Sequence, residues 1–139
     1  MAGTITIKYC DIEKVETECM VNAANSGLRY GSGVCHAVFS GAGVAAMTEA
    51  CNKIGHCDVG KAVVTDAFDL PARWVIHAVG PYTSQPEAMK LLRSAYISAM
   101  EIVRAKDCHK VTFPLISSGA FNDAGLSYEP LWNAAISAI

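Results

Sequence analysis

Hydrophobic and polar residues recur along this chain with two different periods. Apolar residues fall every three or four positions over residues 87–105, which predicts an amphipathic helix. Residues 4–8 alternate apolar and polar side chains with β-branched residues, which predicts a first strand. Short β-rich runs at residues 62–66, 73–79 and 111–115 predict further strands. The mixture predicts an α/β fold.

Residues 19–45 combine three patterns in a row. A short apolar run is followed by a polar turn with Gly-Ser-Gly, and from Val34 toward Ala50 the helical spacing returns. This order predicts a strand, a glycine-rich loop and one helix. The first turn of a helix has unpaired N–H groups and partial positive charge, which suit a phosphate or diphosphate. The dinucleotide fingerprint matches only in part, because His36 stands where its third glycine belongs, so a purely structural turn is the alternative.

The C-terminal residues predict a last helix. Ser127 occupies a capping position, with Glu129 and Pro130 in the first turn. The sequence reaches Ile139 while this helix is still apolar.

Length and charge limit the classes of protein that fit. With 139 residues, 52% of them hydrophobic, the chain suffices for one domain with a real core. Its formal net charge is -2 and Lys and Arg do not cluster, so no nucleic-acid partner is expected. No apolar run approaches the roughly 20 residues of a membrane span, so no membrane partner is expected.

Six cysteines raise the questions of disulfides and of metal binding. Several lie in predicted strands or helices, and the sequence opens without a recognisable signal peptide, which favours reduced thiols and a cytoplasmic location. Three Cys-His neighbours occur without the C-x-x-C spacing of a zinc site, so no metal and no cofactor are predicted.

Three motifs resemble the macrodomain family. Residues 21–25 read Val-Asn-Ala-Ala-Asn, as at the family's strand end, and residues 31–34 fit its Gly-x-Gly-Val loop with Ser32 at a common glycine. Residues 117–121 fit its second loop, Ser-Ser/Thr-Gly followed by an aromatic residue. Further matches lie between these motifs, at residues 60–62, 70–71, 76–77 and 80–81.

The resemblance implies a three-layer α/β/α macrodomain with a mixed central sheet. It covers residues 1–139 as a single domain. The family's usual last strand and helix are missing from the sequence, so we expect a C-terminally truncated domain with an empty strand position in the sheet.

The resemblance also implies a binding site for ADP-ribose or its derivatives. Asp11 and Ile12 would contact the adenine, although Asp11 could instead cap the segment that follows. Asn25 would orient the distal ribose, which Phe121 would cover, while backbone N–H groups of both loops bind the diphosphate. The implied ligand-binding residues are Asp11, Ile12, Asn22, Asn25, Gly31, Ser32, Gly33, Val34, Cys35, Ser117, Ser118, Gly119, Ala120 and Phe121.

Catalysis is the less direct implication. One large class of macrodomain hydrolases carries an Asp at the position of Cys35. Cys35 could pack as a small residue or, if the helix lowered its pKa, act as a nucleophile. Our leading hypothesis is a hydrolase that uses Asn25 as its catalytic residue. Such an enzyme would remove ADP-ribose from the side chains of ADP-ribosylated proteins, or acetyl from O-acetyl-ADP-ribose. The alternative is a non-catalytic reader of ADP-ribosylated proteins. His77, inside an apolar strand, is predicted to be a buried structural histidine.

Overall fold

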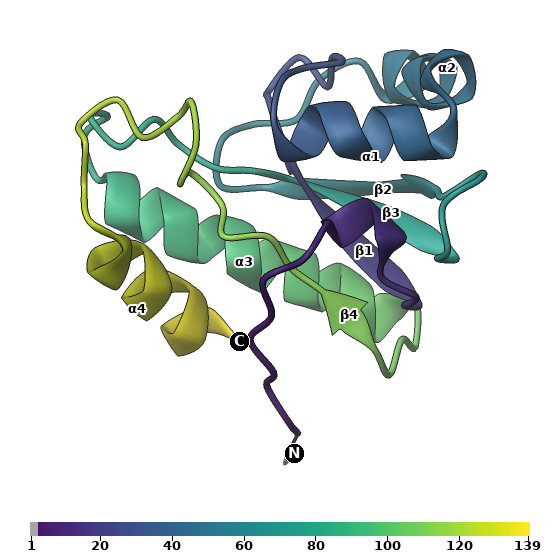
Figure 1. The fold of residues 1–139 in the computed structure, drawn as a ribbon. Helices are drawn as coiled ribbons and strands as arrows, with labels where there is room; N and C mark the ends of the chain where they lie inside the picture. The colour runs from purple at the N-terminus through teal and green to yellow at the C-terminus, as the bar shows by residue number, and fades with distance from the viewer. Residues whose placement is uncertain (1–2) are drawn as a thin grey trace.

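The computed structural model describes residues 3–139, in which helices cover both faces of a four-stranded sheet (Figure 1). The elements, in chain order, are η1 (Ile12–Lys14), β1 (Cys19–Ala24), α1 (Val34–Ala42), α2 (Val44–Ile54), β2 (Ala62–Asp66), β3 (Trp74–Val79), α3 (Ala88–Ala105), β4 (Val111–Thr112) and α4 (Tyr128–Ala138).

The sheet is mixed, as predicted. Its strand order is β2-β3-β1-β4, with β1 parallel to both β3 and β4 and β2 antiparallel to β3. In the β1–β3 register Asn22 lies opposite His77. The parallel strands therefore end at one edge of the sheet, and the loops that follow them meet there.

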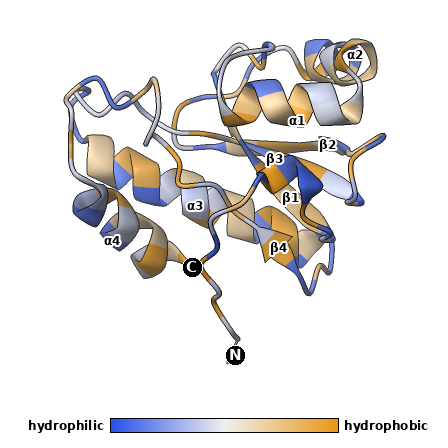
Figure 2. Cartoon of the chain, in the orientation of Figure 1, coloured by the Kyte–Doolittle hydropathy of each residue, from blue (hydrophilic) through white to orange (hydrophobic). Residues whose placement is uncertain are grey.

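Alternating residues of β1 and β3 build two cores. Met20 and Val75 belong to the cluster formed with α1 and α2, whereas Val21 and Ile76 belong to the cluster formed with α3 and α4. Because both faces are buried, these strands are apolar at nearly every position. Along α3 hydrophobic and hydrophilic residues both occur (Figure 2), as one buried face requires. The predicted α/β/α layers are confirmed.

The predicted single helix from Val34 toward Ala50 is wrong. Gly43 has φ 102° and ψ 107°, outside the helical region, and ends α1. The axis turns by 109° before α2 begins. Within residues 3–139 no single helix is long and apolar enough to cross a membrane; α1 and α2 pass that test only when taken together across this bend.

The predicted first strand is also wrong, and the strand at residues 111–115 is shorter than predicted. Residues 4–8 form no ladder, and Ile5 and Ile7 are 57% and 68% exposed. β4 contains only Val111 and Thr112, and Pro114 just beyond it has no N–H to donate. Within residues 3–139 no strand pairs with the outer edge of β4, so the alternating N-terminal segment has no ladder to join.

A groove of about 1020 Å³ lies between the N-terminal segment and β4. Its lining includes Ile7, Phe113 and Leu115, and α4 contributes Trp132 and Ile136. The groove occupies the position next to the β4 edge, where the sequence predicts an empty strand position.

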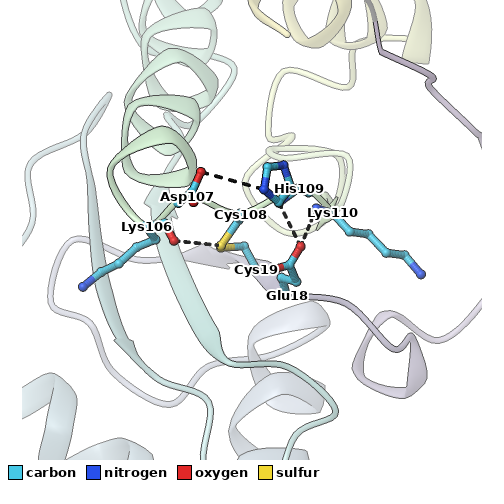
Figure 3. Close-up of polar contacts among 7 residues, drawn as sticks. All are labelled: Glu18, Cys19, Lys106, Asp107, Cys108, His109 and Lys110. Carbon is cyan, nitrogen blue, oxygen red and sulfur yellow. Dashed lines mark hydrogen bonds and ion pairs between the residues drawn. A yellow bond between two sulfur atoms is a disulfide. The ribbon is translucent and has the colours of Figure 1, made fainter.

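A disulfide between Cys19 and Cys108 corrects the expectation that all six thiols are reduced (Figure 3). Cys19 begins β1, and Cys108 lies in the connection between α3 and β4. The same connection is held by the Glu18 carboxylate, which accepts the backbone N–H groups of His109 at 2.8 Å and Lys110 at 3.1 Å. Spacing could not reveal this pair, because six cysteines allow 15 connectivities.

Candidate functional site

The end of β1 passes into a turn that Asn25 closes. Its Oδ1 accepts the Arg29 backbone N–H at 2.9 Å, and its Nδ2 donates to the Arg29 carbonyl at 2.9 Å. Leu28, with φ 54°, is 2% exposed and anchors the turn in the core. An amide nitrogen can donate two bonds and an amide oxygen can accept two, so the half-buried Asn25 keeps one of each for a ligand.

The first glycine loop leads from this turn into α1. Gly33 occupies the N-cap position with φ 61°, where a side chain would be strained. Within the described chain, the backbone N–H groups from Ser32 to Cys35 have no acceptor. Ser32 and Gly33 are exposed, so this loop presents free donors to an anion.

Cys35 lies directly beneath the loop. Its Sγ donates to the Arg29 carbonyl at 3.4 Å. A Cβ added to Gly31 would lie 3.5 Å from Asn25 Nδ2 and 3.6 Å from Cys35 Sγ, so Gly31 separates the amide from the thiol. Burial raises the pKa of the Cys35 thiol above its ordinary value, so the thiol is neutral at pH 7. This environment favours the packing interpretation over a nucleophile.

Asn22 is fully buried, and its amide joins a chain of bonds under the site. Nδ2 of Asn22 lies 3.1 Å from Nδ1 of His77, and Nε2 of His77 lies 2.9 Å from the Thr65 hydroxyl. Burial lowers the pKa of His77 to about 4, so the ring is neutral at pH 7 and acts as the predicted structural histidine. Asn22 also contacts Cys35 Sγ at 3.8 Å. Because Asn22 has no exposed surface and contacts both Cys35 and His77, its side chain holds the loop in this structure.

The second loop follows β4 at the same edge of the sheet. The Ser117 hydroxyl donates to the Pro81 carbonyl at 2.7 Å, and the Ser118 hydroxyl donates to the Leu115 carbonyl at 2.6 Å. Ser117 has φ 63° and is 6% exposed. Within residues 3–139 the backbone N–H groups from Ser117 to Phe121 have no acceptor. Both serines thus fix the loop with their side chains and leave its N–H groups free.

The groove described above brings parts of both loops together with the N-terminal segment. Gly33, Val34 and Ser118 line it, as do Asp11 and Ile12. The other predicted residues do not line the groove, and three of them, Asn22, Cys35 and Ser117, are buried.

Asp11 occupies the N-cap position of η1, where its backbone carbonyl accepts the Lys14 N–H at 3.1 Å. Its carboxylate makes no capping hydrogen bond and pairs instead with Lys14 at 3.4 Å, with both side chains largely exposed. The alternative that Asp11 serves only as a cap is therefore wrong. The Ile12 N–H has no acceptor in the part of the chain that the structure describes. An exposed carboxylate beside a free N–H can recognise a donor–acceptor edge such as that of adenine.

Sequence reasoning missed the residues that support Phe121. Tyr82 stacks on the Phe121 ring with centroids 4.3 Å apart, and the Thr83 N–H donates to the Phe121 carbonyl at 2.9 Å. Asp123 accepts two bonds from Ser84 across 39 residues of sequence. No local motif could have linked these segments.

Residues 3–139 contain no group of three or more His, Cys, Asp or Glu side chains placed to hold a metal ion.

The structure is that of an α/β protein with helices on both faces of a mixed sheet. Two loops rich in free N–H donors follow the ends of parallel strands, where they can hold an anionic group. The chain belongs to the macrodomain family: the family described as Macro domain matches residues 21–123.

Relatives of known sequence and structure agree with this assignment. The chain is 41% identical over 120 residues to the ADP-ribose glycohydrolase MACROD1 of Mus musculus, covering 84% of this chain and 37% of that protein. It is 38% identical over 130 residues to an O-acetyl-ADP-ribose deacetylase of Cronobacter turicensis, covering 87% of this chain and 72% of the relative. The Oceanobacillus iheyensis macrodomain with ADP superimposes with a TM-score of 0.86 at 32% identity, covering 93% of this chain and 70% of that one. The chain thus spans little more than a third of the mouse glycohydrolase.

Proposed function

We propose that this macrodomain binds ADP-ribose with its diphosphate between the two glycine loops. The observation that carries the proposal is the pair of donor runs, Ser32 to Cys35 and Ser117 to Phe121, whose backbone N–H groups have no acceptor within the described residues. Such donors stabilise a diphosphate without a metal ion. The relatives named for ADP-ribose chemistry and the homologous structure that holds ADP support the same ligand class.

Adenine recognition by Asp11 provides the first test. Calorimetric titration of ADP-ribose into the chain is expected to give micromolar binding, and Asp11→Ala is expected to weaken it about tenfold because a charge-assisted bond to the exocyclic amine is lost. Glu49 on α2 is an exposed carboxylate that pairs with Lys53, so Glu49→Gln is the control and should bind ADP-ribose like the wild type. Absence of binding by a folded sample would refute the proposal.

We further propose that the domain hydrolyses a bond at the distal ribose, either releasing ADP-ribose from protein side chains or deacetylating O-acetyl-ADP-ribose. Asn25 keeps one donor and one acceptor for the ribose hydroxyls while it holds the Arg29 backbone. Cys35 supplies no base, since its thiol is buried and neutral. In this mechanism a ligand phosphate helps to activate the attacking water, and Asn25 fixes the ribose beside it.

Replacing Asn25 tests this role. Asn25→Ala should lower turnover at least ~10-fold, because ribose positioning contributes more than ~1.4 kcal/mol to the barrier and the turn loses both bonds to Arg29. Release of ADP-ribose from a modified protein, measured at saturating substrate, is the assay. Unchanged turnover in a folded variant would exclude this role for Asn25.

A reader of ADP-ribosylated proteins is the second candidate. The neutral thiol at Cys35 favours it, because the position contributes neither a carboxylate nor a thiolate to chemistry. The same assay separates the two functions: a hydrolase removes the modification at saturation, whereas a reader leaves it in place and protects it from other hydrolases.

A further inference from the structure

Phe121 lies at a junction between two loops that are distant in sequence. Its ring stacks on Tyr82 with an interplanar angle of 21°, and its carbonyl accepts the Thr83 N–H at 2.9 Å. Tyr82 and Thr83 belong to the connection between β3 and α3. The position of the Phe121 ring therefore depends on how firmly this connection is held to the second glycine loop.

Asp123 makes the charged bonds of this junction. Its Oδ1 accepts the Ser84 backbone N–H at 2.9 Å, and its Oδ2 accepts the Ser84 hydroxyl at 2.6 Å. These bonds hold the pKa of the Asp123 carboxyl below its ordinary value, so it is ionised at neutral pH and accepts at both oxygens. Two charge-assisted bonds to one residue fix orientation as well as distance.

A second set of bonds supports the same junction. The Thr83 hydroxyl, on a residue only 7% exposed, donates to Asn122 Oδ1 at 2.9 Å and accepts the Ala124 N–H at 2.9 Å. Asn122 in turn closes its own loop through two bonds with the Leu126 backbone, each 2.9 Å long. Asp123 thus lies within a connected network and is placed to fix Phe121, two residues before it.

We propose that Asp123 is a positioning residue for the distal end of the ligand: by holding Ser84 it fixes the Phe121–Tyr82 pair and sets the preference for ADP-ribose over ADP. The inference rests on the proposed function. Asp11 and Ser118 share the groove lining, whereas Phe121 lies outside it, three residues beyond Ser118. A ligand that spans both would place its adenine near Asp11 and its distal ribose at Phe121. ADP lacks that ribose and would not depend on the junction.

The experiment compares the affinities of ADP-ribose and ADP for the wild type, Asp123→Asn and Ser84→Ala. We expect Asp123→Asn to weaken ADP-ribose five- to tenfold and to change ADP by less than twofold. Ser84→Ala combined with Asp123→Asn should weaken ADP-ribose less than the product of the two single effects, because both changes break the same contact. Asp107→Asn is the matched control: its carboxylate is 93% exposed and lies after α3, at the opposite end of the sheet, so both affinities should stay at the wild-type values.

Amide hydrogen exchange tests the junction without a ligand. Exchange at Thr83 and Ser84 should accelerate in Asp123→Asn and not in Asp107→Asn, because the bonds of Ser84 to the carboxylate are weakened. Equal weakening of ADP and ADP-ribose, or no change in either, would overturn the inference. If the wild type binds neither ligand, the proposed function is refuted, and so is a role for Asp123 in ligand preference. The exchange experiment would still show whether Asp123 holds the two loops together.

Discussion

Reduction of the Cys19–Cys108 disulfide is expected to lower the free energy of unfolding by about 2–4 kcal/mol. The two cysteines are 89 residues apart, so the bond closes a long loop and removes much of the conformational entropy of the unfolded chain. The bonds from Glu18 to His109 and Lys110 hold the same connection in the folded state, so we expect reduction to leave the fold intact. Urea unfolding with and without dithiothreitol, followed by tryptophan fluorescence, measures the difference.

Thiol titration and a double variant serve as controls for the disulfide. The oxidised protein, denatured without reductant, should show four reactive thiols, those of Cys10, Cys35, Cys51 and Cys57. A Cys19→Ala/Cys108→Ala variant should unfold at the same urea concentration with and without reductant, which separates loop closure from the loss of buried sulfur. Six reactive thiols in the untreated protein would contradict the disulfide.

Gly80→Ala is expected to destabilise the protein by about 3 kcal/mol and to abolish ADP-ribose binding. Gly80 follows β3, and a Cβ at this position would overlap Ile116 Cγ2 and crowd Ser117 Oγ. Ile116 and Ser117 are 1% and 6% exposed, so neither can yield into solvent. The backbone of the second loop would have to move, and its free N–H groups would move with it. Chemical denaturation and calorimetric titration measure the two effects.

The second glycine loop supplies its own control for this substitution. Gly119 has no atom within 4 Å of an added Cβ and does not have positive φ, so Gly119→Ala should change stability by less than about 0.5 kcal/mol. A Gly80→Ala variant as stable as the wild type would show that Ile116 and Ser117 can repack around the added methyl group.

Periodicity predicted those elements that depend on local pattern alone. The helix predicted at residues 87–105 is found as Ala88–Ala105, because one buried face imposes a regular spacing over its whole length. Periodicity did not predict the bend at Gly43, because the apolar spacing continues across it from Ala42 to Ala45. Only the backbone angles of Gly43 mark the bend. The segment at residues 4–8 has the pattern of a strand, but a strand also needs a neighbour, which its own pattern cannot reveal.

For the site, the motifs located both loops but not the contacts that shape them. The pairing of Asn25 with Arg29 depends on the backbone geometry of the turn. The pairing of Asp123 with Ser84 joins segments that are 39 residues apart in the sequence. The burial of Asn22 follows from its place in a central strand beneath α1. The roles of the exposed residues stay predictions, which the ligand titrations address.

The turn closed by Asn25 is organised before any ligand arrives. Both polar groups of the Asn25 amide are bonded to Arg29, and Leu28 is buried beneath them. We therefore expect a ligand at this end of the site to dock to a preorganised receptor without coupled folding. The heat-capacity change of binding should reflect the apolar area buried between protein and ligand, with no contribution from ordering of the turn.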